Sequence, residues 1–134
     1  MLILLRARLI SFMVLSPSVR VGVMVENYYY GYFESEAELR RKLETKTVAR
    51  TKAPGAEYRI NWVIKRRIVL AQSDFPKKAV VLEELEGPGG RKELRLGYYI
   101  INRRGRWQWG QFASMIHKHD LERLIEIAKE KGFL

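Results

Sequence analysis

The clearest alternation of apolar and polar positions lies in residues 58–71. Even-numbered positions are mostly apolar there, and odd-numbered positions are mostly polar or basic. Successive side chains of a strand point to opposite faces, so the two sets separate. The pattern predicts a strand whose apolar face packs on a core and whose outward face is basic. The basic face carries Arg59, Lys65 and Arg67.

Three further segments predict strands that continue from this one. Residues 79–86, 92–101 and 106–112 are rich in apolar and aromatic positions. The first turn between them reads Gly-Pro-Gly-Gly at residues 87–90, and the second contains Gly105, which is free to adopt a positive φ. Consecutive strands joined by short turns predict a four-stranded antiparallel β-meander.

A short strand and a helix are predicted ahead of the meander. The aromatic run at residues 27–33 is typical of a strand. Ser35 is followed three residues later by Glu38, which is the spacing of a capping box and predicts a helix over about residues 36–43. Residues 44–57 show no apolar period and are rich in Thr, Lys, Pro and Gly, so we expect a loop there.

The chain ends in a predicted amphipathic helix. Gly132 is placed to end this helix, and the helix is expected to lie on the apolar face of the sheet. Trp62 and Tyr98 are expected to face it from the strands. The apolar stripe is formed by Leu121, Leu124, Ile125 and Ala128.

These elements define an α+β fold: a four-stranded antiparallel β-meander backed by a C-terminal helix and preceded by a short strand–helix unit. Residues 24–134 have a length typical of one domain. Residues 1–23 hold three arginines and no acidic residue. Their apolar stretches are too short for a transmembrane helix, and a secretory signal would carry its charges before the apolar run. We expect either a β-rich arm packed on the domain or an extension upstream of a start at Met24.

Composition and charge indicate which kinds of function the chain can have. The 134-residue chain has no cysteine, which excludes disulfides and cysteine nucleophiles and suits a reducing cytoplasm, the location we expect. Its formal net charge is +10. Residues 58–112 hold twelve Lys and Arg against five Asp and Glu, whereas residues 24–57 and 113–134 are balanced. A surplus confined to one region indicates a surface for a polyanionic partner.

Aromatic residues are interleaved with these basic ones. Basic side chains that follow a phosphate backbone, with rings that stack on bases, are the means of single-strand binding. We therefore predict binding of single-stranded DNA or RNA with little sequence preference, and no cofactor, metal or membrane. Lys46, Arg50 and Lys52 of the predicted loop are expected to become ordered on binding. The phosphate contacts predicted from the basic strand face and the turn are Arg59, Lys65, Arg67 and Arg103, and the predicted stacking residues are Tyr99, Trp107 and Trp109.

The segment from the third predicted strand to the last helix has a distinctive order of motifs. Residues 94–100 read Leu-Arg-Leu-Gly-Tyr-Tyr-Ile, residues 103–107 read Arg-Arg-Gly-Arg-Trp, and Gly110 precedes the helix. This order resembles the positive cofactor four transcriptional coactivators, whose plan the plant Whirly proteins share. The resemblance implies a homodimer that binds single-stranded nucleic acid across its sheets, through Arg95, Arg104 and Arg106. The unit at residues 27–43 has no counterpart in that domain.

Two other functions stay open. A localised positive charge also suits a protein-interaction or regulatory module with an acidic partner. Glu83, Glu84 and Glu86, followed by Lys92, are the residue types of a metal-dependent nuclease, in which carboxylates hold Mg²⁺. Glu84 and Glu86 alternate with core positions of the predicted strand, however, so a solvated acidic strand end is the expected interpretation.

A pair of histidines also has the chemistry of a metal ligand. His117 and His119 lie beside Asp120 at the predicted start of the last helix. A metal needs ligands that converge on one side, and two side chains spaced i and i+2 on a helix diverge. We therefore expect exposed helix-entry residues here and no metal site.

Overall fold

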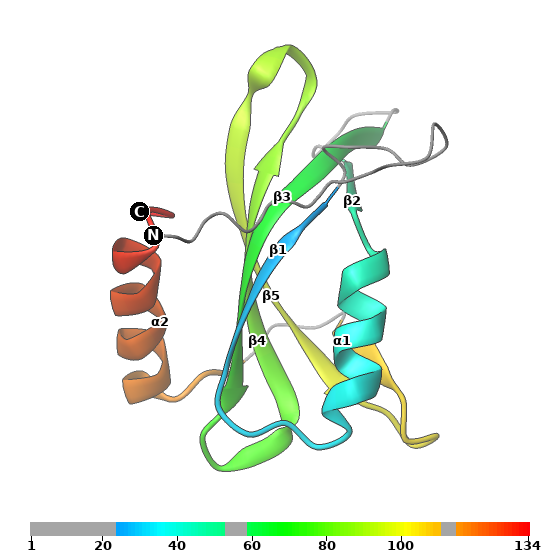
Figure 1. Ribbon diagram of the computed structural model, residues 1–134, viewed down its shortest axis with the longest axis vertical. Coiled ribbons are helices and arrows are strands. Elements are labelled where there is room, and N and C mark those ends of the chain that lie inside the picture. Colours follow the sequence, from blue (N-terminus) through cyan, green and yellow to red (C-terminus); the bar gives the residue numbers. More distant parts are fainter. Residues whose placement is uncertain (1–23, 53–58, 111–114) are drawn as a thin grey trace, which may run out of the picture.

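The computed structural model describes residues 24–52, 59–110 and 115–134 (Figure 1). It contains a mixed sheet of six strands with two helices, which confirms the predicted α+β class. No helix in these ranges is both long and apolar enough to cross a membrane. The elements in chain order are β1 Glu26–Tyr30, α1 Glu36–Thr45, β2 Val48–Lys52, β3 Arg59–Gln72, β4 Phe75–Glu86, the 3₁₀ turn η1 Pro88–Gly90, β5 Lys92–Ile101, β6 Trp107–Trp109 and α2 Lys118–Glu130.

Strand β3 is the axis of the sheet, and both of its edges are paired. One edge pairs antiparallel with β4, which is followed by β5 and β6 in antiparallel order. Two short strands share the other edge. β1 runs parallel to the second half of β3, with Tyr28 beside Ile68, and β2 runs antiparallel to the first half, with Ala49 opposite Trp62. The sheet thus has six strands and not four, because β1 and β2 both pair with β3.

Strand β2 lies in the segment that was predicted to be a loop, so the loop prediction is wrong for Val48–Lys52. The periodicity of apolar residues is weak in β2, because Ala49 is the one residue of its five that is fully buried. Backbone pairing to β3 holds the segment, and the indole Nε1 of Trp62 adds a 2.7 Å hydrogen bond to Thr51 Oγ1. Arg50 and Lys52 therefore belong to a strand and need no ligand to order them. Residues 53–57 of the predicted loop lie outside the described residues.

A β-bulge at Lys65 changes which side chains of β3 share a face. Ile64 lies opposite Leu85 and Arg66 lies opposite Glu84, so Lys65 is the extra residue between them. Opposed residues of an antiparallel pair point to the same face, and the alternation therefore reverses across the bulge. The predicted single basic face is wrong for this reason, and Arg67 points to the face opposite Lys65.

The two helices cover opposite faces of the sheet (Figure 1). Under α1, the core is formed by Leu39, Leu43, Val69, Val81, Tyr99 and Trp107. Under α2, it is formed by Ile68, Leu70, Val80, Leu124, Ile127 and Phe133. The central strands are therefore buried on both sides, which explains why β3 and β4 become continuously apolar in their inner halves. The last helix packs on the sheet as expected.

Trp62 and the stripe of α2 differ from expectation. Trp62 precedes the bulge and packs with Ala49, Ile64 and Leu85, away from α2. Ile125 of the predicted stripe is exposed, whereas Asp120, which is not part of that stripe, is buried. The carboxylate of Asp120 accepts hydrogen bonds from the backbone N and Oγ of Ser73, so it ties α2 to the β3–β4 turn.

The start of α1 is not the predicted capping box. Ser35 adopts a left-handed conformation with φ 51°, and its side chain makes no capping hydrogen bond. The carboxylate of Glu38 instead accepts a hydrogen bond from the backbone N of Trp107, at 3.2 Å. Glu38, which the sequence pattern assigned to a capping box, thus joins α1 to Trp107 of β6, 69 residues further along the chain.

Candidate nucleic-acid interface

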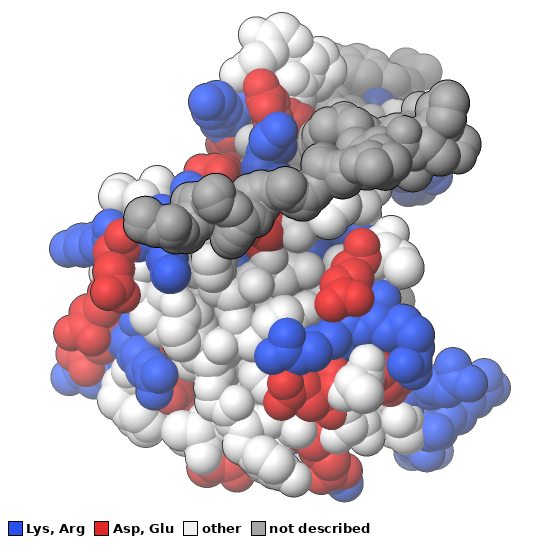
Figure 2. Space-filling model, in the orientation of Figure 1, with Lys and Arg blue, Asp and Glu red and all other residues white. Residues whose placement is uncertain are grey.

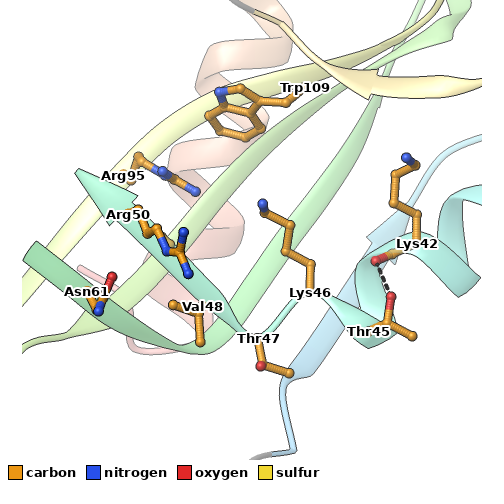
Figure 3. Close-up of a pocket in the computed structure, with 10 residues that line it drawn as sticks. Lys42, Thr45, Lys46, Thr47, Val48, Arg50, Asn61, Arg95 and Trp109 are labelled. Carbon is orange, nitrogen blue, oxygen red and sulfur yellow. Dashed lines mark hydrogen bonds between the residues drawn. The ribbon is translucent and has the colours of Figure 1, made fainter. Parts of the chain in front are cut away.

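A hollow of about 890 Å³ opens beside the C-terminal end of α1 (Figure 3). It is bounded by α1, β2, the start of β3, β5 and β6. Four of its lining side chains are basic, and none of those contributed by the described residues is acidic. The lining residues are Lys42, Thr45, Lys46, Thr47, Val48, Ala49, Arg50, Asn61, Arg95 and Trp109.

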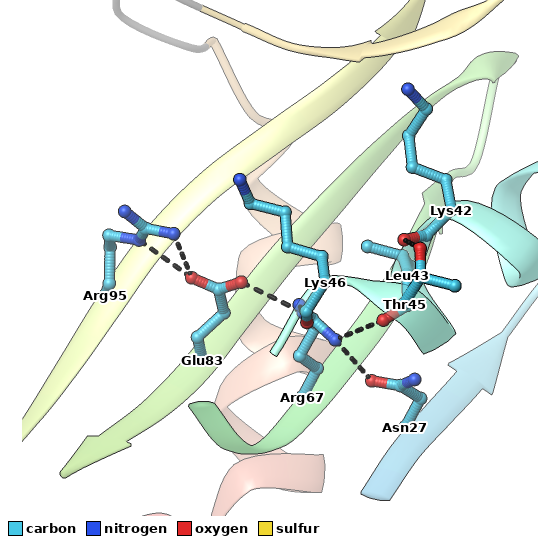
Figure 4. Close-up of polar contacts among 8 residues, drawn as sticks. All are labelled: Asn27, Lys42, Leu43, Thr45, Lys46, Arg67, Glu83 and Arg95. Carbon is cyan, nitrogen blue, oxygen red and sulfur yellow. Dashed lines mark hydrogen bonds and ion pairs between the residues drawn. The ribbon is translucent and has the colours of Figure 1, made fainter. Parts of the chain in front are cut away.

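A buried ion triad, composed of Arg67, Glu83 and Arg95, lies beside the hollow (Figure 4). Arg67 Nε donates to Glu83 Oε2 at 2.9 Å, and Arg95 Nε donates to Glu83 Oε1 at 2.7 Å. Arg67 and Glu83 are fully buried, and about a quarter of the Arg95 side chain is exposed. Buried charges of this kind persist only when they are paired and hydrogen-bonded. Because one carboxylate serves two guanidinium groups, the triad keeps a net positive charge.

Arg67 also completes the end of α1. Its Nη1 donates to the backbone O of Leu43 at 2.9 Å and to Asn27 Oδ1 at 3.0 Å, and its Nη2 donates to the backbone O of Lys46. The last carbonyls of a helix lack partners within the helix, and a cation there also opposes the negative end of the helix dipole. The guanidinium group therefore fixes the helix end from which Lys42 and Lys46 extend. The prediction that Arg67 contacts phosphate is wrong, because the side chain is enclosed.

Trp109 forms a fixed wall of the hollow. Its ring lies over Gly97 so closely that a Cβ at that position would stand 2.1 Å from the indole. Tyr99 meets the ring edge-on with centroids 5.2 Å apart, and the guanidinium carbon of Arg95 lies 4.6 Å from the ring centroid. Trp109 is held on these sides and remains half-buried, so part of its surface is open to a ligand.

The other two predicted stacking residues are buried, and those predictions are wrong. Trp107 is 0% exposed and Tyr99 is 2% exposed, both in the core under α1. Trp107 Nε1 donates to the backbone oxygens of Glu34 and Ser35, which fixes the ring against the start of the helix. Burial raises the pKa of the Tyr99 phenol. The α1 unit covers both rings. The resemblance did not predict this burial, because the positive cofactor four domain has no counterpart of that unit.

A second basic group lies on the turn between β5 and β6. Arg103, Arg104 and Arg106 are exposed, and their contact with phosphate remains a prediction. Asn102 Oδ1 accepts hydrogen bonds from the backbone N of Arg104 and of Arg106, and Gly105 has φ 78°, so the turn has a defined shape. Figure 2 shows basic side chains gathered at the lower right corner, where this turn lies in Figure 1. The hairpin therefore carries Trp109 at one end and three arginines at the other.

Lys65 and Arg59 are exposed but are not among the residues that line the hollow. Lys65 Nζ is 3.8 Å from Glu86 Oε1, on the face opposite Glu83. Arg59 begins β3 and is not among the lining residues. Of the predicted contacts, the structure thus unites Arg95 and Trp109. It adds Lys46 and Arg50, which had been assigned to the loop.

Lys42 is the basic lining residue that the sequence analysis did not predict. Charge counting treated residues 24–57 as balanced, and this hid a local cluster at the helix end. The available signal was the closeness in sequence of Lys42, in the last turn of α1, and Lys46, its C-cap residue.

The acidic residues of the nuclease interpretation do not form a cluster. Glu83 belongs to the triad, whereas Glu84 points to the other face and accepts two hydrogen bonds from Arg66, at 2.8 and 2.9 Å. Hydrogen bonds that Arg66 donates to Glu84 hold the pKa of the Glu84 carboxyl below its usual value. Within the described ranges, no group of three His, Asp or Glu side chains is arranged to hold a metal ion.

The two histidines do not diverge as predicted. The rings of His117 and His119 stack with centroids 5.5 Å apart. His117 Nε2 lies 2.7 Å from Asp74 Oδ2, and His119 Nε2 lies 2.9 Å from Ser73 Oγ. Both rings thus contact the β3–β4 turn, because Asp120 anchors the helix there.

Comparison with protein-family models, with curated proteins and with solved structures finds no match for this chain.

Proposed function

We propose that this protein binds single-stranded nucleic acid, DNA or RNA, with little sequence preference. The observation that carries the proposal is the hollow, which four basic side chains line together with the half-buried Trp109. Positive charge attracts a phosphate backbone, and an aromatic face stacks on any base for about 1–3 kcal/mol. The three arginines of the β5–β6 turn extend the same positive surface along the hairpin.

The position of Trp109 favours single strands over duplex. Its ring is held by Gly97, Tyr99 and Arg95 and forms a wall of the hollow instead of projecting from the surface. A base paired inside a duplex is stacked on its neighbours and cannot reach such a ring, whereas an unpaired base can turn toward it. The resemblance to positive cofactor four and Whirly domains favours the same partner, and it also implies a homodimer, which remains a prediction.

Fluorescently labelled oligothymidine, compared with a duplex of equal length, tests the proposal. We expect tighter binding of the single strand and a linear fall of log affinity with log salt concentration, with a slope of about −0.7 per neutralised phosphate. Absence of binding at low salt, or equal affinity for duplex and single strand, would overturn the proposal.

A further inference from the structure

The two lysines at the end of α1 are placed to hold an anion. Figure 3 shows the ammonium groups of Lys42 and Lys46 directed to the same side as Trp109. Neither lysine is ion-paired with a carboxylate of the described residues. Lysines near a helix C-terminus often bind the last carbonyls, but here Arg67 already occupies those of Leu43 and Lys46. The ammonium groups are therefore available to a ligand.

The hollow also has the dimensions of a small-molecule site. Its volume of about 890 Å³ falls within the range of roughly 300–1,000 Å³ that is typical of ligand sites. The ring of Trp109 bounds one side and the lysine ammonium groups lie on another. An aromatic face and a pair of cations in one hollow match the two parts of a nucleotide, its base and its phosphate.

We infer that the hollow is a nucleotide subsite, in which one unpaired base stacks on Trp109 and its phosphate lies between Lys42 and Lys46. The inference rests on the proposed function and makes a narrower claim. The subsite uses α1, which lies outside the segment that resembles a known family. Because the base and the phosphate are both bound within the hollow, a mononucleotide should occupy it without the rest of a strand.

Adenosine 5′-monophosphate, adenosine and inorganic phosphate are the probes that separate these contributions. Trp107 is enclosed and Trp62 is nearly so, which leaves Trp109 as the tryptophan of the described residues whose fluorescence a ligand can quench directly. We expect the monophosphate to quench this fluorescence and to bind at least about tenfold more tightly than adenosine or phosphate alone.

The double substitution Lys42→Ala with Lys46→Ala tests the phosphate half. It should weaken binding of the monophosphate by about tenfold or more and leave adenosine binding unchanged. Lys118→Ala with Lys129→Ala is the matched control, because it removes the same charge from exposed positions of α2. The control should bind the monophosphate as the unmodified protein does. Lys46→Gln, at an exposed position, serves if the double variant fails to fold.

Oligothymidine titrated in parallel separates this inference from the proposed function. If the monophosphate does not quench, or if the hollow variant and the control variant bind it equally, the subsite is wrong. Should oligothymidine still bind in that case, the proposed function stands on another surface. If oligothymidine itself does not bind the unmodified protein, the proposed function is wrong as well.

Discussion

Glu83 accepts a hydrogen bond from Arg67 across two neighbouring strands at 2.9 Å, and both side chains are fully buried. The same carboxylate holds Arg95 at the edge of the hollow, and the same guanidinium group holds the end of α1. The lysines of α1 and the arginine of β5 are therefore positioned by one buried pair. The pair contributes to the proposed site without being exposed to the ligand.

Replacement of Glu83 by Gln should destabilise the protein strongly. The amide cannot neutralise two guanidinium groups, and removing one partner of a buried ion pair costs about 3–5 kcal/mol. Urea unfolding measures the loss. Glu93→Gln is the control, because Glu93 pairs with Arg91 where both side chains are exposed, and such pairs contribute about 0–1 kcal/mol. Equal free energies of unfolding for the two variants would contradict the buried role.

Replacement of Gly97 by Ala should displace Trp109. The added Cβ would stand 2.1 Å from the indole ring, and such overpacking costs about 1–3 kcal/mol. We expect a lower free energy of unfolding together with weaker oligonucleotide binding. Trp109→Leu in the same chain removes the clash, so the double variant should be more stable than the sum of the single effects predicts. Purely additive effects in this double-mutant cycle would show that the two residues are not in contact.

Acid should remove the contribution of Glu84 to stability. Arg66 holds the pKa of Glu84 below its ordinary value of 4.5, so the unfolded chain takes up this proton first as the pH falls. The contribution is present above the ordinary value and is lost as the pH falls through the lower folded value. Glu84→Gln should therefore cost about 1–2 kcal/mol at pH 7 and less at pH 3, measured by urea unfolding. A difference that stays constant with pH would contradict this assignment.

The sequence was sufficient for most of the local elements, β2 excepted, but not for the way in which they share the sheet. Strand and helix positions followed from apolar period, because that period reflects burial of one face. The bulge at Lys65 has no such signal, and it reverses the alternation that placed Arg67 outward. β2 was missed because its stability comes from pairing with β3, a contact distant in sequence.

The candidate site shows the same division. Arg95, Arg104 and Arg106 were predicted as contacts from the resemblance, and that prediction placed them on a strand and a hairpin turn, where the structure has them. The burial of the aromatic residues depends on α1, which covers Tyr99 and Trp107 and leaves Trp109 partly exposed. Lys42 and Lys46 reach the hollow because α1 lies over the sheet, a tertiary arrangement that residue spacing alone does not contain.

Replacement of Arg104 and Arg106 by Ser should weaken oligonucleotide binding without destabilising the protein. Both side chains are exposed, and the turn is shaped by Asn102, whose Oδ1 bonds to their backbone N–H groups, so the fold does not depend on the guanidinium groups. If each arginine neutralises one phosphate, the salt slope should become shallower by about 1.4.

Lys65→Ser with Lys129→Ser is the comparison for this pair, because it removes two exposed positive charges that neither line the hollow nor belong to the turn. The two double variants lose the same net charge, so an effect of total charge alone would change both slopes equally. A shallower slope in the arginine variant only would place the phosphate backbone along the β5–β6 hairpin, between the basic turn and Trp109. An equal change in both would mean that the positive charge of this protein attracts nucleic acid without a defined track.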